Sequence, residues 1–141
     1  EDTRAIEWVA FASNAFNVMA PFYADIDETP DYFANTTGEV STENFYWSSR
    51  MIAAMADASY KKSIFHIERY QEHVMAKAHL IMNYSDDELA KESDAAKRME
   101  IKREANQEIA QMVKKETSDT LAKVLYELSN QMKNSYARSD A

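Results

Sequence analysis

The sequence predicts a mainly α-helical fold in which a short N-terminal strand and a long loop precede long antiparallel helices. The residues that break helices are scarce and early: the 141 residues contain one glycine, Gly38, and two prolines, Pro21 and Pro30. After Gly38, apolar side chains recur at helical spacing. We therefore expect a single domain or fragment, with a strand and an aromatic-rich loop over 1–41 and a helical region over 42–141.

The N-terminal segment begins with an apolar run over residues 5–12. Its length and its aromatic content are typical of a buried strand. Residues 13–41 hold both prolines, the glycine and several Asn, Thr and Asp residues, and this composition predicts a loop. A loop of this size is usually functional or wraps other structure, and its aromatic side chains need burial. These side chains are Phe16, Phe22, Tyr23, Tyr32 and Phe33.

Two helices are expected in the middle of the chain. Thr42 matches an N-cap for a helix over 43–59, and a second helix is expected over about 62–83. Residues Ser85 to Glu88 match a capping box, which predicts that a new helical turn starts there.

The last helix is expected to run from Asp94 to about Tyr136 without interruption. A helix of that length measures about 65 Å, whereas a compact domain of this size has a radius of gyration of roughly 14 Å. The helix must therefore bend, break or overhang the core, and an overhang with an apolar stripe needs a partner surface. The stripe consists of Met99, Ile109, Val113, Thr117, Val124, Leu128 and Met132.

Composition excludes several functions. The formal net charge of −8 at pH 7 argues against a nucleic-acid partner, which requires a basic surface. The sequence has neither an apolar run long enough to span a membrane nor the pattern of a signal peptide. It contains no cysteine, which excludes disulfides, thiolate zinc sites and a cysteine nucleophile within these residues. This composition fits a reducing compartment, and we expect a cytoplasmic location.

No metal site or catalytic motif stands out from the residues alone. Di-iron bundles use Glu-x-x-His motifs, and none of His66, His73 and His79 has a glutamate three residues before it. His66 and His73 lie about 10 Å apart along a helix axis, too far for one ion. We therefore expect no metal site among these residues. A Gly-x-Ser-x-Gly motif is absent, although spacing alone does not exclude a Ser-His-Asp triad.

Two stretches resemble a known family. Glu7 to Ile26 has the sequence EWVAFASNAFNVMAPFYADI, and Asn44 to Tyr60 has the sequence NFYWSSRMIAAMADASY. Both resemble the C-terminal third of bacterial cysteine dipeptidases of the dipeptidase A type and, less closely, the secernins, which are N-terminal-nucleophile hydrolases. The resemblance is specific over about residues 5–75, and residues 76–141 match in character only. Its most specific residues are Trp8, Phe11, Asn17, Pro21, Phe22 and Tyr23.

The resemblance implies an αββα sandwich to which this chain contributes one strand and helices. It also implies an enzyme that hydrolyses dipeptides with broad specificity, without a cofactor. In this family a cysteine at the mature N-terminus attacks the peptide carbonyl, and its own α-amino group accepts the proton. The chain begins at Glu1 and contains no cysteine, so we expect an inactive C-terminal fragment whose partners are the missing N-terminal half and the dipeptide substrate.

The resemblance makes Asn14 and Asn17 candidates for the substrate pocket, with Ser13 a weaker one, because amides can bind a peptide carbonyl or an oxyanion. The alternative role of these side chains is to hold a long loop together. Without the missing half, the strand over 5–12 is expected to lack a partner. The isolated fragment should then self-associate through this strand or the long helix, which makes a homo-oligomer the expected state.

A different class of function remains open. The chain is alternatively a non-catalytic helical protein-interaction module that docks through the apolar stripe of residues 94–136. A metal carrier built as a four-helix bundle is a third possibility, but it lacks its ligands.

Overall fold

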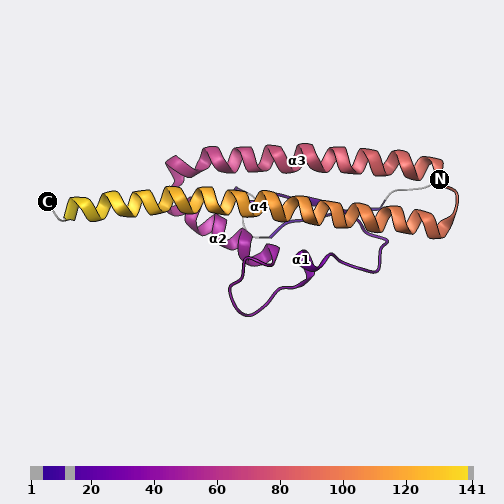
Figure 1. Ribbon diagram of the computed structural model, residues 1–141, viewed down its shortest axis with the longest axis horizontal. Coiled ribbons are helices and arrows are strands. Elements are labelled where there is room, and N and C mark those ends of the chain that lie inside the picture. The colour runs from indigo at the N-terminus through magenta and orange to yellow at the C-terminus, as the bar shows by residue number, and fades with distance from the viewer. Residues whose placement is uncertain (1–4, 12–14, 140–141) are drawn as a thin grey trace.

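The computed structural model describes residues 5–11 and 15–139, with side chains placed up to residue 132. The elements in chain order are β1 (Ile6–Val9), β2 (Ala20–Tyr23), α1 (Asp31–Ala34), α2 (Phe45–Ala58), α3 (Tyr60–Lys91) and α4 (Ala95–Ser139). Figure 1 shows α3 and α4 side by side and antiparallel, with α2 and the N-terminal segments packed along them. The mainly helical fold with a short N-terminal strand and long C-terminal helices is thereby confirmed.

The N-terminal strand is shorter than predicted and forms a hairpin. β1 pairs with β2 in an antiparallel two-stranded sheet, with Ile6 opposite Tyr23 and Val9 opposite Ala20. The expectation that this strand lacks a partner within the chain is therefore wrong. The prediction of an unbroken loop over 13–41 is also wrong, because that segment contains β2 and α1. Pro21 concealed β2, since proline is compatible with a strand only where its missing N–H is not needed.

The aromatic side chains of the N-terminal segment pack inside the chain itself. Phe33 lies at the centre, with its ring centroid 4.6 Å from that of Phe45 and 4.8 Å from that of Phe22. Tyr32 packs against both Phe33 and Phe45. All four side chains are buried. This cluster joins β2, α1 and the start of α2.

The predicted cap of the first long helix is displaced by two residues. Asn44, not Thr42, is the N-cap of α2, and its side-chain oxygen accepts a hydrogen bond from the Trp47 N–H at 2.9 Å. The Thr42 carbonyl instead accepts a hydrogen bond from the Ser48 hydroxyl at 3.3 Å. Both residue types make good caps, and tertiary contacts of this kind select between them.

The second helix does not end near residue 83. α3 continues through Ser85 to Lys91, so the predicted new start at Ser85–Glu88 is wrong. Ser85 is buried, and its hydroxyl donates to the carbonyl of Ile81, one turn earlier, at 2.8 Å. A serine that bonds back in this way stays within a helix and does not cap a new one.

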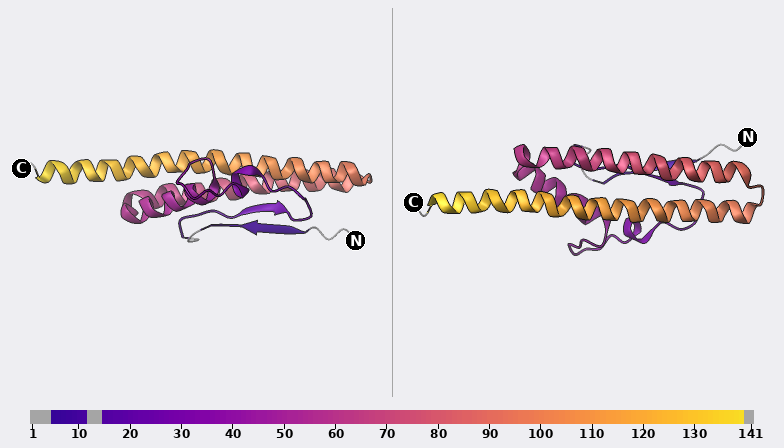
Figure 2. Two further views of the ribbon diagram at one scale, coloured as in Figure 1. Left: turned by 90° about the horizontal axis from the view of Figure 1, so that it is seen from below. Right: turned by 45° about the horizontal axis from the view of Figure 1, so that its top comes forward.

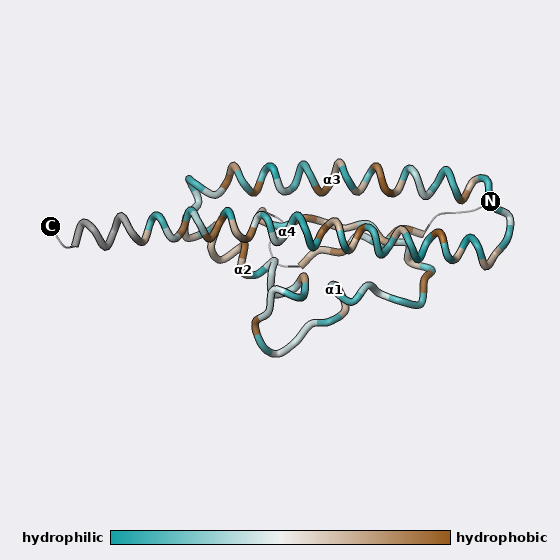
Figure 3. The backbone as a smooth tube through the Cα atoms, in the orientation of Figure 1, coloured by the Kyte–Doolittle hydropathy of each residue, from teal (hydrophilic) through white to brown (hydrophobic). Residues whose placement is uncertain are grey.

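The last helix begins at its predicted position. The Asp94 carboxylate accepts a hydrogen bond from the Lys97 N–H at 3.0 Å, which caps α4. Most of the predicted stripe is internal, since four of its seven residues, Ile109, Val113, Thr117 and Val124, are fully buried, whereas Met132 is 65% exposed. Figure 3 shows hydrophobic and hydrophilic residues alternating along α3 and α4, and Figures 1 and 2 show α4 extending past the start of α3. The helix therefore overhangs the core.

Ionic contacts tie α3 to α4. Glu116 is almost fully buried on α4, and its carboxylate binds the ammonium of Lys77 and lies 3.6 Å from Nδ1 of His73. Burial alone would raise the pKa of Glu116, but the hydrogen bond and charge of Lys77, with His73, lower it below its ordinary value of 4.5. Nearer the overhang, His66 Nε2 and a Glu127 carboxylate oxygen are 3.2 Å apart.

Asn106 attaches the hairpin to α4. Its side-chain oxygen accepts the Tyr23 N–H at 2.9 Å, and its side-chain nitrogen donates to the Tyr23 carbonyl at 3.1 Å. Both bonds are buried, and Asn106 is 3% exposed. One amide side chain thus takes the place of a neighbouring strand along this part of β2.

Replacing Asn106 with leucine should therefore destabilise the chain strongly. Asn106→Leu removes both hydrogen bonds that Asn106 makes to the buried backbone of Tyr23, which costs about 2–5 kcal/mol. The matched control is Gln107→Leu, which makes the same chemical change at the adjacent, exposed position. Urea denaturation of both variants measures the difference, and equal free energies of unfolding would contradict this role of Asn106.

The Glu116 contacts should make stability sensitive to acid. Because the folded-state pKa of Glu116 lies below 4.5, the unfolded chain takes up this proton first as the pH falls. The contribution is present above that value and is lost as the pH drops through the folded-state pKa. Thermal midpoints measured from about pH 6 down to about pH 3 should fall less for Glu116→Gln than for the parent chain. Lys77→Gln should flatten the profile in the same way, and parallel profiles for all three proteins would refute the assignment.

Candidate functional site at the hairpin turn

The segment that leads into β2 lies over the middle of α3. A cavity of about 220 Å³ separates them, lined by Asn17, Val18, Met19, Gln71, Val74 and Met75. Val18 and Val74 are buried, while Met19 and Met75 are each 43% exposed. The cavity is therefore apolar at its base, and both amide-bearing residues are on its wall.

Gln71 fixes the position of this segment. Its side-chain nitrogen donates to the carbonyl of Asn17 at 3.0 Å and to that of Ala15 at 3.4 Å. Asn17 itself is 4% exposed. The backbone on both sides of Phe16 is thus tied to α3, which orients whatever polar groups the segment presents.

Of the three site residues predicted from the sequence, the structure describes one. Asn17 lines the cavity. Ser13 and Asn14 lie outside the described residues. Gln71 was missed by the sequence analysis, because a glutamine on a polar helix is indistinguishable from a solvated one until the fold places a loop over it.

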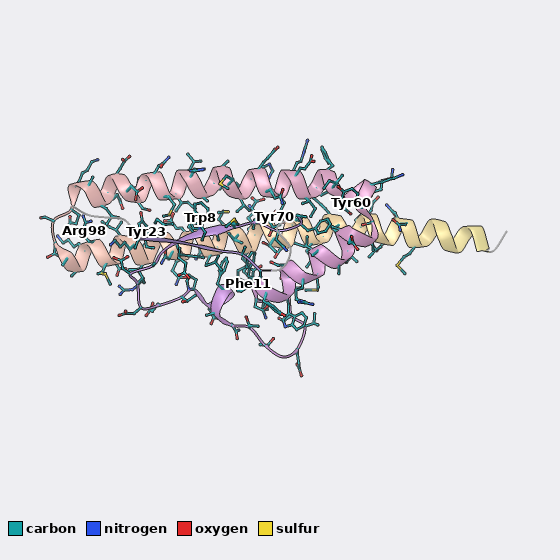
Figure 4. The ribbon with its side chains drawn as sticks, turned by 180° about the vertical axis from the view of Figure 1, so that it is seen from behind. Trp8, Phe11, Tyr23, Tyr60, Tyr70 and Arg98 are labelled. Carbon is teal, nitrogen blue, oxygen red and sulfur yellow. The ribbon has the colours of Figure 1, made fainter. Side chains whose placement is uncertain are left out.

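A second, smaller cavity lies next to the first along the same face of α3. It has a volume of about 70 Å³ and is lined by Ile6, Trp8, Pro21, Met75, Ala78, His79, Met82 and Asn83. Met75 borders both cavities, so they lie next to each other between the hairpin and α3. Trp8 is 46% exposed on this surface (Figure 4).

These residues bind and orient more readily than they react. Among the described residues, no three His, Asp or Glu side chains gather closely enough to hold a metal ion. In the bundle beneath, the Tyr70 hydroxyl lies 2.8 Å from the Thr117 hydroxyl, and burial raises the pKa of Tyr70, which keeps it protonated. Within the part of the chain that the structure covers, no helix has both the length and the hydropathy needed to cross a membrane.

Comparison with known proteins identifies the class to which this architecture belongs, which is that of the peptidases. Residues 1–73 match Peptidase family C69, a range that includes the hairpin, α1, α2 and the first part of α3. The match covers more than half of the chain, and the chain belongs to this family.

Several relatives are named dipeptidases. The chain is 39% identical over 140 residues to a probable dipeptidase A of Streptococcus pyogenes serotype M18, covering 99% of this chain and 29% of that protein. It is 34% identical over 175 residues to a dipeptidase of Bifidobacterium longum, covering 98% of this chain and 33% of that protein. It is 28% identical over 133 residues to a probable dipeptidase B of Lactococcus lactis, covering 94% of this chain and 27% of that protein. The chain thus spans about a third or less of the length of these relatives, and the resemblance to dipeptidases is confirmed.

Proposed function

We propose that this chain is the C-terminal part of a cysteine dipeptidase that hydrolyses dipeptides with broad specificity. The observation that carries the proposal is the difference in coverage: 99% of the chain aligns with a probable dipeptidase A, but the aligned part is only 29% of that protein. The chain has no cysteine. The nucleophile would therefore belong to the remaining polypeptide, and the chain alone would be inactive.

The proposed chemistry divides between the two parts. A cysteine at the mature N-terminus of the remaining polypeptide would attack the dipeptide carbonyl, with its α-amino group accepting the thiol proton. The tetrahedral intermediate carries a negative oxygen, which N–H donors stabilise. Asn17, with Asn14 and Ser13, would supply donors or bind the substrate backbone. Gln71 holds the backbone carbonyl of Asn17, which favours this role because an anchored backbone leaves the side chain less reorganisation during reaction.

The proposed partners follow from the same division. They are the remaining polypeptide, a dipeptide substrate and a second copy of the assembled enzyme. The alternative function, a helical interaction module that docks through the α4 stripe, has less support. Ile109, Val113 and Val124 of that stripe are fully buried within the chain itself. Among the stripe residues whose side chains the structure describes, Met132 is exposed, and Met99 and Leu128 are partly exposed.

A chimera tests the proposed activity. In the probable dipeptidase A of Streptococcus pyogenes serotype M18, the 140 residues that align with this chain are replaced by the chain itself. We expect the chimera to hydrolyse Leu-Leu with kcat/KM within about tenfold of the parent enzyme, a difference of about 1.4 kcal/mol in the barrier. The 141-residue chain alone should give no hydrolysis.

The parent enzyme truncated before the aligned residues is the negative control, because it shows what the replaced part contributes. Turnover is measured as the amount of leucine released, which is quantified by chromatography. A chimera that folds, as judged by a cooperative thermal transition, and still fails to cleave any dipeptide in a mixed panel would overturn the proposed function.

Asn17 can be tested in the same chimera. If its amide contacts the reacting carbonyl, Asn17→Ala should lower kcat on the order of 100-fold, as loss of one oxyanion donor does. Gln71→Ala is the matched comparison, because it releases the loop without removing the Asn17 side chain. If both variants lose activity in proportion to their loss of thermal stability, the role of Asn17 is to pack the loop. Asn14→Ala and Ser13→Ala extend the comparison to the other two candidates.

A further inference from the structure

An exposed guanidinium lies over two aromatic rings in the first turns of α2. Arg50 follows Tyr46 by four residues and Trp47 by three, so the three side chains share one side of the helix. The guanidinium carbon is 5.5 Å from the centroid of the Tyr46 ring and 6.0 Å from that of the Trp47 ring. Nη1 donates to the Tyr46 hydroxyl at 3.3 Å. These contacts orient a positive charge that remains open to solvent.

The two rings beneath the guanidinium, Tyr46 and Trp47, form an aromatic platform that is itself held in place. The Trp47 indole N–H donates to the Thr37 carbonyl at 2.7 Å, and its backbone N–H donates to the Asn44 side chain at 2.9 Å. Phe11 meets the Tyr46 ring edge-on, with the centroids 5.8 Å apart. Because the platform is ordered before any ligand arrives, binding at the guanidinium costs less side-chain entropy.

Arg50 has no acidic partner within the described residues. The chain has 24 Asp and Glu residues against 16 Lys and Arg residues, so acidic partners are plentiful. Lys102 and Lys114 are each paired with one. Arg50 contacts the aromatic platform and a hydroxyl instead, which leaves most of its N–H donors to water or to a ligand. The ligand that matches a planar guanidinium is a carboxylate, which accepts two parallel hydrogen bonds from it.

The Arg50 face of α2 and the cavity wall that carries Asn17 flank the same hairpin turn. Phe11, on the β1 side of the turn, packs against the aromatic platform. On the β2 side, Gln71 holds the carbonyls of Ala15 and Asn17. Four peptide units connect Phe11 to Ala15, which keeps their Cα atoms within about 14 Å of each other. The guanidinium is therefore placed beside the segment that the proposed function assigns to substrate binding.

We infer that Arg50 binds the free carboxylate of the dipeptide substrate and thereby favours peptides that end one residue after the cleaved bond. This inference rests on the proposed function. In every dipeptide the carboxylate belongs to the residue that supplies the nitrogen of the cleaved bond, so it lies close to the reaction without taking part in it. A chain with a net charge of −8 repels such an anion unless a local cation attracts it. Arg50 supplies that cation and the paired donors.

Two substrates that differ in one group isolate the proposed contact. Leu-Leu and Leu-Leu amide share the cleaved bond and both release leucine, but only Leu-Leu has the carboxylate. Arg50→Gln and Arg50→Lys are made in the Streptococcus pyogenes chimera. Arg69→Gln is the matched control, because Arg69 on α3 is also exposed and lies 4.3 Å from the centroid of an aromatic ring, that of Phe65.

Arg50→Gln should lower kcat/KM for Leu-Leu by roughly 10- to 100-fold, the effect of losing hydrogen bonds to a charged group. The value for Leu-Leu amide should be unchanged, so that the preference for the free carboxylate disappears. The loss should fall mainly on KM, because the contact is present before and during the reaction. Arg50→Lys should give an intermediate value, since lysine keeps the charge but not the planar pair of donors. Arg69→Gln should leave both substrates unaffected.

Three results would overturn the inference. The first is a parent chimera that cleaves Leu-Leu amide as efficiently as Leu-Leu. The second is an Arg50→Gln variant that keeps the full preference for Leu-Leu. The third is an equal loss for both substrates, which would assign Arg50 to an acidic residue of the remaining polypeptide. A variant that merely folds less well belongs to this third case, because unfolding removes activity toward both substrates alike.

The carboxylate contact and the dipeptidase function fail separately. If the chimera folds but is inactive, calorimetric titration with Leu-Leu and with Leu-Leu amide replaces the kinetic comparison. Tighter binding of Leu-Leu that is lost in Arg50→Gln then leaves the contact standing and sinks only the function. An active chimera whose preference survives Arg50→Gln sinks only the contact. An inactive chimera in which Arg50→Gln leaves the binding of both compounds unchanged sinks both.

Discussion

The antiparallel contact between α3 and α4 supports every other element of the chain. Apolar side chains pack along this contact. Buried polar groups form hydrogen bonds across it, as the hydroxyls of Tyr70 and Thr117 do. Burying the carboxylate of Glu116 costs desolvation free energy, and Lys77 and His73 offset that cost from the facing helix. The hairpin, α1 and α2 are each too short to be stable alone, and they acquire their positions by packing on this pair.

The helical part of the fold was accessible from sequence because its signals are local. Scarcity of glycine and proline, together with the spacing of Ile109, Val113 and Val124, predicts α4 without knowledge of any neighbour. Where the prediction failed, burial or a tertiary contact decided the outcome. Ser85 has the sequence signature of a cap, but it is buried, and its hydroxyl donates to the Ile81 carbonyl one turn earlier. Pro21 argues against a strand, yet it lies opposite Trp8 in the hairpin, and Tyr23, two residues further on, is held by Asn106, far along the chain.

The candidate site shows the same difference between what local sequence signals predict and what tertiary contacts decide. Asn17 was reachable through its place in a family pattern, whereas the residue that holds its backbone, Gln71, belongs to a helix whose polar face gives no hint of a loop above it. The division also explains why function was not legible in the residues alone. The cavities beside the hairpin carry no sequence motif of their own. The resemblance to dipeptidases, with the family match over residues 1–73, is what connects them to peptide hydrolysis. Under the proposed function, the nucleophile would come from the remaining polypeptide.

The one-sided closure of the hairpin by Asn106 limits what this chain can do when it meets other chains. Amyloid-like filaments grow because each added strand presents a fresh edge to the next arrival. Here the far side of the sheet is sealed by an amide side chain and a proline, so a strand captured by β1 cannot be matched by another on the opposite flank of the same molecule. Stacking of identical molecules through this sheet would therefore stop at a pair, because only the β1 side of the hairpin is left to accept another strand.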